Sequence, residues 1–194
     1  MRTGQESGTL DGVSEPDLVP ALVAELGKKT GVSWLTYASG YDQVRATHAA
    51  WHAWVETDDG GALYVVSGGD EQPLPGIEQA RRVEVTMRSK ENGGRLVTWV
   101  ADASRVTPDE ESWGTVTAAL VAGRLNLDDL ATAADGWAAT SVVTRLAPTG
   151  ETVERPGELT DASHRAVPRE TEATTRGPLP RVLHRRVKRR PRLS

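Results

Sequence analysis

The sequence predicts a mainly β (α+β) domain in which about six short antiparallel strands form a barrel or a sandwich. Two turn signals support this prediction. Asp59 followed by Gly60, and Asn92 followed by Gly93, each lie between segments rich in β-branched and aromatic residues. Residues 83–88 (VEVTMR) alternate apolar and polar side chains, as a half-buried strand does. Strands joined by such tight turns run antiparallel, which argues against a doubly wound parallel sheet.

The first half of the chain is expected to hold one helix and then four strands. A helix is predicted over residues 17–28, because Leu18, Leu22 and Leu26 recur at helical spacing just after Pro16. The β-branched and aromatic segments that follow predict strands over residues 32–37, 46–56, 62–67 and 83–88. A short helix is also expected over residues 77–81.

The second half is expected to hold two strands and two helices. A long strand over residues 95–106 follows the second turn. Thr107 is the predicted N-cap of a helix over residues 108–120, because acidic residues fill its first turn. A short helix over residues 127–134 and a strand over residues 138–146 complete the domain. The tryptophans within apolar runs are expected in the core, namely Trp34, Trp99, Trp113 and Trp137.

Charge divides the chain into an acidic body and a basic tail. Residues 1–150 hold 12 Lys and Arg against 21 Asp and Glu, whereas residues 151–194 hold 11 against 6. We therefore predict a disordered segment over residues 1–15, a folded domain over 16–150 and a disordered basic tail over 151–194. The tail is expected to be solvated. The alternative is weak, nonspecific nucleic-acid contact through its clustered Arg and Lys.

Composition excludes several classes of function. The chain has no cysteine, which rules out disulfides and thiol catalysis and fits a cytoplasmic protein. No apolar run has the roughly 18 residues that a membrane span needs. No serine lies in the strand-turn-helix motif of hydrolases, so no catalytic residue is assigned.

The strand over residues 46–56 carries the first candidate site residues. His48, His52 and Trp54 would share one strand face, with Trp51 on the other. Two imidazoles beside an indole suit a flat aromatic ligand. No third ligand for a metal is evident, so no metal site is predicted. The alternative is an edge or interface strand, and either Trp51 or Trp54 would then be free for a dimer interface or a ligand.

Two further segments could contact a ligand. Ser67, Gly68 and Gly69 begin a Gly- and Pro-rich loop whose backbone N–H groups could approach a ligand, although a plain connecting loop fits equally. Across the second hairpin, cationic side chains could bind a phosphate or carboxylate, or could simply be solvated charges. The residues of this second group are Arg88, Ser89, Lys90 and Arg95.

The order of these elements resembles the pyridoxamine 5′-phosphate oxidase-like split β-barrel family. The resemblance covers about residues 17–147 and is strongest in LYVVSGG followed by a short helix and VEVTMRSK. It is nearest to the actinobacterial flavin and deazaflavin oxidoreductase branch. The resemblance implies a split β-barrel homodimer with FMN or coenzyme F-420 in clefts between the subunits.

Mapped onto this sequence, the resemblance implies a cleft formed by residues 48–54, 67–69 and 88–90 with Arg95. One loop departs from the family pattern, because Asp70, Glu71 and Gln72 stand where oxidase members carry a Ser-Arg-Lys segment. Phosphate anchoring would then fall to Arg88, Lys90 or Arg95. The expected function is a flavin- or deazaflavin-dependent oxidoreductase acting on a small molecule. The alternative is a non-catalytic dimeric binding module that has lost its cofactor.

Overall fold

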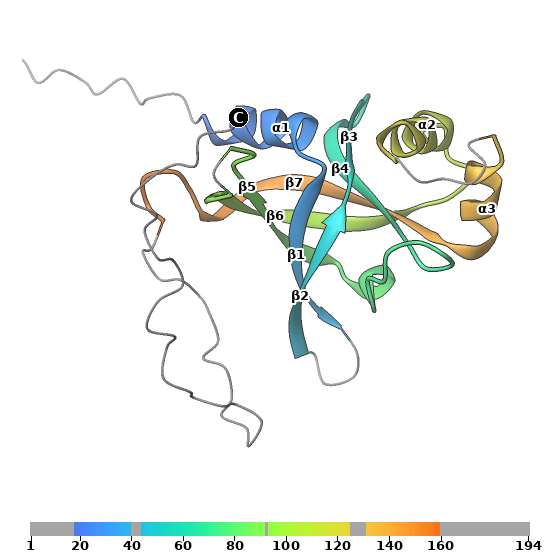
Figure 1. Ribbon diagram of the computed structural model, residues 1–194, viewed down its shortest axis with the longest axis horizontal. Coiled ribbons are helices and arrows are strands. Elements are labelled where there is room, and N and C mark those ends of the chain that lie inside the picture. Colours follow the sequence, from blue (N-terminus) through green and yellow to red (C-terminus); the bar gives the residue numbers. More distant parts are fainter. Residues whose placement is uncertain (1–17, 40–43, 92, 125–130, 160–194) are drawn as a thin grey trace, which may run out of the picture. The chain divides into compact units, whose positions relative to one another are not determined.

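The computed structural model describes residues 18–39, 44–91, 93–124 and 131–159 (Figure 1). The described residues form one seven-stranded antiparallel sheet with three α-helices and one 3-10 turn, which confirms the mainly β prediction. The elements in chain order are α1 (Val19–Lys29), β1 (Val32–Ser39), β2 (Val44–Trp51), β3 (Ala53–Thr57), β4 (Gly60–Ser67), η1 (Ile77–Gln79), β5 (Arg82–Arg88), β6 (Arg95–Val106), α2 (Trp113–Gly123), α3 (Ala133–Thr140) and β7 (Val142–Glu154).

The sheet curls upon itself at His52. Its strand order is β2-β1-β5-β6-β7-β4-β3, so β2 and β3 form the two edges although only His52 separates them in the chain. The two edges therefore meet at this residue. The strand predicted over residues 46–56 is thus two strands, because the chain leaves one edge of the sheet and joins the other there.

The inner side of the curled sheet holds the main hydrophobic core. Leu35, Val85 and Val97 are fully buried there. Helix α1 closes this core with Val23, and Leu22 and Leu26 pack against it, as the helical spacing predicted. The opposite side of β1, β5 and β6 carries alternate residues such as Thr36 and Thr86. We call this side the outer face.

A second hydrophobic cluster lies where α2 and α3 pack against β3, β4 and β7 (Figure 1). Val116, Leu120 and Trp137 are buried in it. The tryptophan predictions are confirmed for Trp99 and Trp137, which are 2% and 4% exposed. They are wrong for Trp113, which covers the edge of this cluster, and for Trp34, which lies half-buried on the outer face.

Several predicted boundaries in the second half are wrong. Helix α2 begins at Trp113, because residues 108–112 form turns in which the Thr107 N–H donates to Glu110 Oε1 at 2.7 Å. The strand predicted over residues 138–146 begins too early, because residues 138–140 belong to helix α3. The helical conformation is favoured there because it buries the Trp137 side chain. The helix expected over 127–134 lies largely outside the described residues.

Strand β7 continues past the predicted domain boundary at residue 150. Thr152 pairs with Trp99 and Glu154 pairs with Thr98, so residues 151–154 belong to the sheet and not to a tail. The predictions for residues 1–15 and 160–194 lie outside the described residues. None of the described helices has the length and apolar character needed to cross a bilayer.

Candidate functional site

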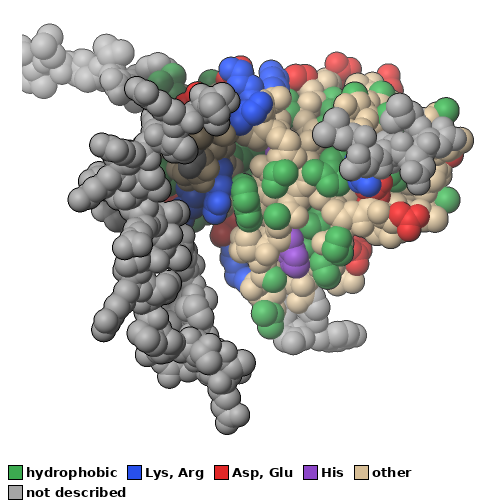
Figure 2. All heavy atoms as spheres, in the orientation of Figure 1, with side chains coloured by type: hydrophobic (Ala, Val, Ile, Leu, Met, Phe, Trp, Pro, Cys, Tyr) green, Lys and Arg blue, Asp and Glu red, His purple; other side chains and the backbone are tan. Residues whose placement is uncertain are grey.

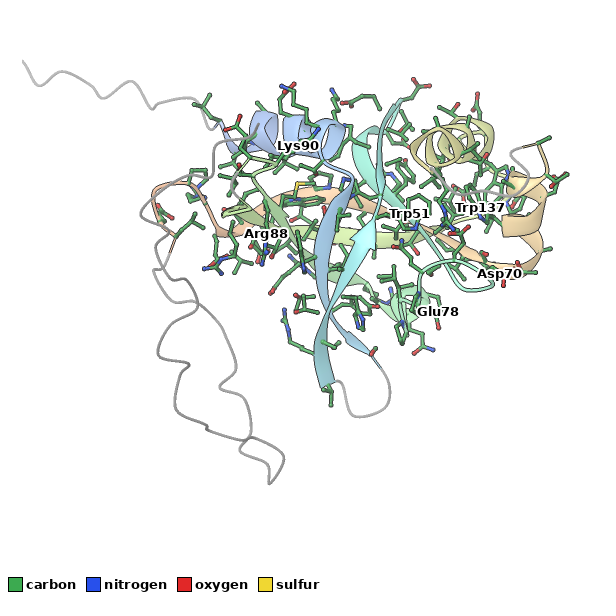
Figure 3. The ribbon with its side chains drawn as sticks, viewed as in Figure 1. Trp51, Asp70, Glu78, Arg88, Lys90 and Trp137 are labelled. Carbon is green, nitrogen blue, oxygen red and sulfur yellow. The ribbon has the colours of Figure 1, made fainter. Side chains whose placement is uncertain are left out.

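The predicted site residues lie in two separate groups in the chain. Trp51 contacts the loop over residues 67–72 through Gln72, and we call this loop and Trp51, with His48 and His52 of the same chain segment, the loop half. Trp34, Arg88, Lys90 and Arg95 lie around the outer face, and we call this group the outer-face half. Arg88 and Lys90 lie toward one end of the molecule and Asp70 and Trp137 toward the other, with Trp51 between them (Figure 3). The hairpin cations and the loop over residues 67–72 therefore lie apart in a single chain, and Trp51 lies between them, because Trp34 pairs with Ala49 and Trp51 shares a strand face with Ala49.

Trp54 belongs to neither half. It packs beneath α1, where a Cβ added to Gly27 would lie 2.4 Å from Trp54 Cε3 and one added to Gly61 would lie 2.6 Å from Trp54 Cζ2. Its Nε1 donates to Glu56 Oε1 at 2.9 Å, and Glu56 also pairs with Lys28. The two glycines thus fit the indole closely, and Trp54 packs against the inner core of the same chain.

Gly68 and Gly69 let the loop half turn tightly against the end of α3. Their φ angles are 83° and 60°, a region that disfavours residues with a Cβ. A Cβ at Gly69 would lie 2.9 Å from Thr140 Oγ1, and Ser141 Oγ donates to the Gly68 carbonyl at 3.1 Å. Packing against α3 therefore accounts for these glycines, while Gly68 and Gly69 themselves remain exposed.

Glu71 is an internal ion-pair partner. Its side chain is only 5% exposed, and its carboxylate pairs with Arg124 and accepts the Trp137 Nε1–H at 2.9 Å. The Arg124 guanidinium lies 5.1 Å from the centre of the Trp51 ring. Arg124 therefore neutralises the charge of Glu71 within the chain. Nothing in the sequence around Glu71 points to Arg124, which is 53 residues away.

Gln72 fixes the loop to the free edge of β2. Its Oε1 accepts the Trp51 N–H at 2.8 Å, and its Nε2 donates to the Trp51 carbonyl at 2.9 Å and to the Val66 carbonyl at 3.1 Å. One side-chain amide thus takes the place that a neighbouring strand would have beside Trp51. Glu71 and Gln72 together tie the loop to the sheet and to the second cluster.

The two histidines of the loop half face the protein interior. His52 is 5% exposed, its Nδ1 lies 3.2 Å from Ser33 Oγ, and burial lowers its pKa to about 4. The His48 ring lies 5.3 Å from that of Tyr37, and burial, with a smaller effect of Glu78, raises the pKa of Tyr37 to about 12. No three His, Asp or Glu side chains group as a metal site among the residues the structure describes.

The outer-face half has a cation without a counter-charge. The Arg88 guanidinium lies 4.1 Å from the centre of the Trp34 ring, and its Nε is buried without a hydrogen-bond partner. No carboxylate of the described residues pairs with it. Arg95 differs, because its Nη1 contacts both oxygens of Glu154 at 2.9 and 3.2 Å. Lys90 is exposed at the hairpin turn.

Ser89 closes the hairpin that carries these cations. Its N–H donates to the Gly94 carbonyl at 2.8 Å, and its Oγ accepts the Glu91 N–H at 3.2 Å. Sequence reasoning missed Trp34 as a member of this half. Strand alternation was the available signal, since Trp34 pairs with Thr86 and Thr86 shares a strand face with Arg88.

Comparison with known proteins shows the fold and no close relative. No family model matches, and no curated protein matches. Among solved structures, the conserved hypothetical protein Rv2991 from Mycobacterium tuberculosis is 16% identical with a TM-score of 0.50, covering 76% of this chain and 86% of its own. The heme storage protein HutZ from Vibrio cholerae is 19% identical with a TM-score of 0.48, covering 66% and 88%.

A third similar structure is a pyridoxamine 5′-phosphate oxidase-related, FMN-binding protein from Nostoc punctiforme. It is 13% identical with a TM-score of 0.44, covering 71% of this chain and 83% of its own. The structural neighbours are split-barrel proteins of the pyridoxamine 5′-phosphate oxidase-like type, which confirms the predicted fold. At these identities the likeness concerns the fold alone.

Proposed function

We propose that this protein is a homodimer that binds a flavin-type cofactor, FMN or coenzyme F-420, in clefts between its subunits and acts as an oxidoreductase on a small molecule. The observation that carries the proposal is Arg88. Its guanidinium is held on the Trp34 ring and has no carboxylate partner among the described residues. An arginine kept in place in this way, with its charge uncompensated, suits an anionic ligand group.

The separation of the two halves supports a dimer. In one chain, Arg88 and Asp70 lie toward opposite ends of the molecule, with Trp51 between them (Figure 3). A second subunit whose outer-face half meets the loop half of the first would complete the cleft that the sequence predicted. In addition, none of the described α-helices makes its main contacts with β1 or β2.

The surface over β1 and β2 also suits a protein interface. On this side of the molecule, hydrophobic side chains lie over the strands and Lys and Arg side chains lie beside them (Figure 2). Threonines occupy part of the outer face. Thr36 and Thr47 join their hydroxyls at 2.8 Å, and Thr86 and Thr98 do so at 2.9 Å. Such paired hydroxyls leave few polar groups that need water.

The residues fit a flavin-type cofactor in part. Arg88 would hold a phosphate, with Lys90 at the rim, and the exposed backbone of Gly68 and Gly69 would approach the ligand from the other subunit. Glu71 and Gln72 do not contribute, because both are occupied by contacts within the chain. The cofactor would supply hydride chemistry, and the protein would orient it and exclude water.

Titration with FMN and with coenzyme F-420, together with the absorbance spectrum and mass of whatever copurifies, tests the proposal. We expect binding of at least one cofactor below about 100 μM, equivalent to roughly −5.5 kcal/mol. Light scattering should give twice the monomer mass. Arg88→Gln should weaken binding, whereas Arg155→Gln, which removes an exposed arginine outside this face, should not. Absence of binding for both cofactors would reject the cofactor claim.

A second candidate function is a dimeric binding module that has lost its cofactor. The buried Glu71 and Arg124 pair favours it, because this contact uses loop groups that a ligand would otherwise meet. The two candidates differ in a simple observable. A yellow protein with bound flavin excludes the module, and a colourless dimer that binds neither cofactor supports it.

A further inference from the structure

The charge balance of the outer face bears on which cofactor this chain would take. Four arginines lie around this face, and three of them are each paired with a glutamate among the described residues. The pairs are Arg45 with Glu84 at 2.6 Å, Arg82 with Glu151 at 2.5 Å, and Arg95 with Glu154 at 2.9 Å. Arg88 is the fourth, and it has an indole in place of a carboxylate.

The pairing of Arg95 is the most informative of the three. Arg88 and Arg95 are direct cross-strand partners, because a register irregularity after Met87 brings Arg95 opposite Arg88. Like charges at such positions repel. Glu154 relieves this repulsion, and its position is itself fixed, since Glu154 Oε2 accepts the Thr98 hydroxyl at 2.9 Å. The Arg95 and Glu154 side chains are only 24% and 16% exposed, so the pair is better shielded than a surface ion pair.

We infer that the outer face is an anion site with one cation, Arg88, left without a carboxylate among the described residues, and that the cofactor it accepts carries one phosphate and no further anionic groups. This inference rests on the proposed function. FMN has a single phosphate monoester. Coenzyme F-420 carries a phosphodiester and a chain of glutamate carboxylates, so it brings several negative charges. On this face those charges would meet Glu84, Glu151 and Glu154, each already bound to the arginine that would otherwise receive them.

Glu154 is thereby a specificity-determining residue, although it need not touch the ligand. With Glu154 neutral, Arg95 and Arg88 would become two adjacent cations, which is an arrangement suited to a ligand with several anionic groups. With Glu154 ionised, only Arg88 is available. The choice between the two cofactors is thus determined by the ion pair between Arg95 of β6 and Glu154 of β7.

The test is equilibrium binding of FMN, riboflavin and coenzyme F-420 to the full chain at fixed ionic strength. Riboflavin lacks the phosphate and so measures the contribution of the anion site. In the wild-type protein we expect FMN to bind at least about tenfold more tightly than riboflavin, as one charge-assisted contact would give. We also expect FMN to bind more tightly than F-420.

Two variants distinguish the contribution of Arg88 from that of the neighbouring Arg95 and Glu154 ion pair. Arg88→Gln should remove the preference for FMN over riboflavin and leave riboflavin affinity unchanged. Glu154→Gln keeps an acceptor for Thr98 and should shift the FMN to F-420 affinity ratio toward F-420 by roughly fivefold or more. Glu158→Gln is the matched control, because it releases Arg155 from an exposed pair and should shift neither ratio.

The outcomes are distinguishable. If F-420 binds the wild-type protein more tightly than FMN, or if Glu154→Gln leaves the ratio unchanged, the inference is overturned while the proposed function stands. If no flavin or deazaflavin binds, the proposed function fails as well. A thermal melt of each variant, with unfolding temperatures close to that of the wild type, ensures that altered binding reflects the site and not the fold.

Discussion

The loop half and the outer-face half place their polar groups in contrasting settings. In the loop half, Glu71 and Gln72 each contact partners within the same chain, and these contacts join the loop to β2 and to α3. In the outer-face half, Arg88 lies on an indole, and no carboxylate of the described residues pairs with its guanidinium. This contrast indicates that a polar residue of a predicted site stabilises the fold when its hydrogen-bond and ion-pair partners lie within the same chain. Mutations should therefore affect stability strongly in the first half and weakly in the second.

The largest effect is expected for Glu71→Gln. This change leaves the Arg124 charge without its partner in a site where the Glu71 side chain is 5% exposed. Breaking a pair buried to this extent costs about 3–4 kcal/mol of unfolding free energy. Chemical denaturation measures the loss. The control is Glu25→Gln, which breaks the exposed pair with Lys29 and should leave the midpoint unchanged.

A double variant sharpens this test. Replacing both Glu71 and Arg124 with methionine removes the two charges together, so no unpaired charge remains buried. We expect the double variant to be more stable than Glu71→Gln alone. If Glu71→Gln proves as stable as the wild-type protein, the loop half is not held by this ion pair, and its acidic residue is available for another role.

The second effect is a loss of stability in acid that depends on His52. Burial lowers the pKa of His52 to about 4, below its usual value of 6.5, so the unfolded chain binds a proton more readily than the folded one. The stabilisation is complete above pH 6.5 and declines as the pH falls toward 4, by up to about 3 kcal/mol in all. Unfolding free energy measured from pH 7 to pH 4 reports this decline.

His52→Asn removes the titrating ring and provides the comparison for that experiment. The variant should show a flatter dependence on pH over this range, although its stability at pH 7 will be lower. Identical slopes for the variant and the wild-type protein would assign the acid sensitivity to other groups.

The third effect concerns the side-chain amide that covers the edge of β2. Gln72→Ala leaves the N–H and carbonyl of Trp51 without their partners, at an expected cost of about 2 kcal/mol. Gln79→Ala is the matched control, because Gln79 is exposed. Hydrogen exchange of the Trp51 amide should also accelerate in Gln72→Ala and remain slow in the control. Equal exchange rates in the two variants would contradict the role assigned to Gln72.

The sequence carried most of the strand pattern, because local chemistry determines it. The turns at Gly60 and Gly93 and the alternation over residues 83–88 correctly placed β4, β5 and β6. The end of β7 was not predictable in the same way. Pro148 and Gly150 ordinarily end a strand, but here the register of β7 against β6 shifts between Ala101 and Trp99, and this irregularity accommodates them.

The candidate site was less predictable than the fold, because its decisive contacts are distant in sequence. Arg124 meets Glu71 across 53 residues, and Glu154 meets Arg95 across 59. Residue type alone indicated that Arg95 was an available cation, whereas Glu154 neutralises it. Arg88 was named correctly as a cation of this hairpin, but the indole beneath it follows only from the register of β1 and β5.

The smallest effect is expected at Arg88 itself. A guanidinium stacked on an indole at a partly exposed site contributes about 0.5–1 kcal/mol. Arg88→Gln should therefore unfold at nearly the wild-type denaturant concentration. A double-mutant cycle with Trp34→Leu should give a coupling energy in this range. A loss of stability as large as that of Glu71→Gln would remove the contrast between the two halves, because Arg88 would then serve the fold as Glu71 does. A small loss accompanied by weaker FMN binding would mark Arg88 as a ligand-binding residue, since removing its charge would then weaken the bound state and leave the fold nearly unchanged.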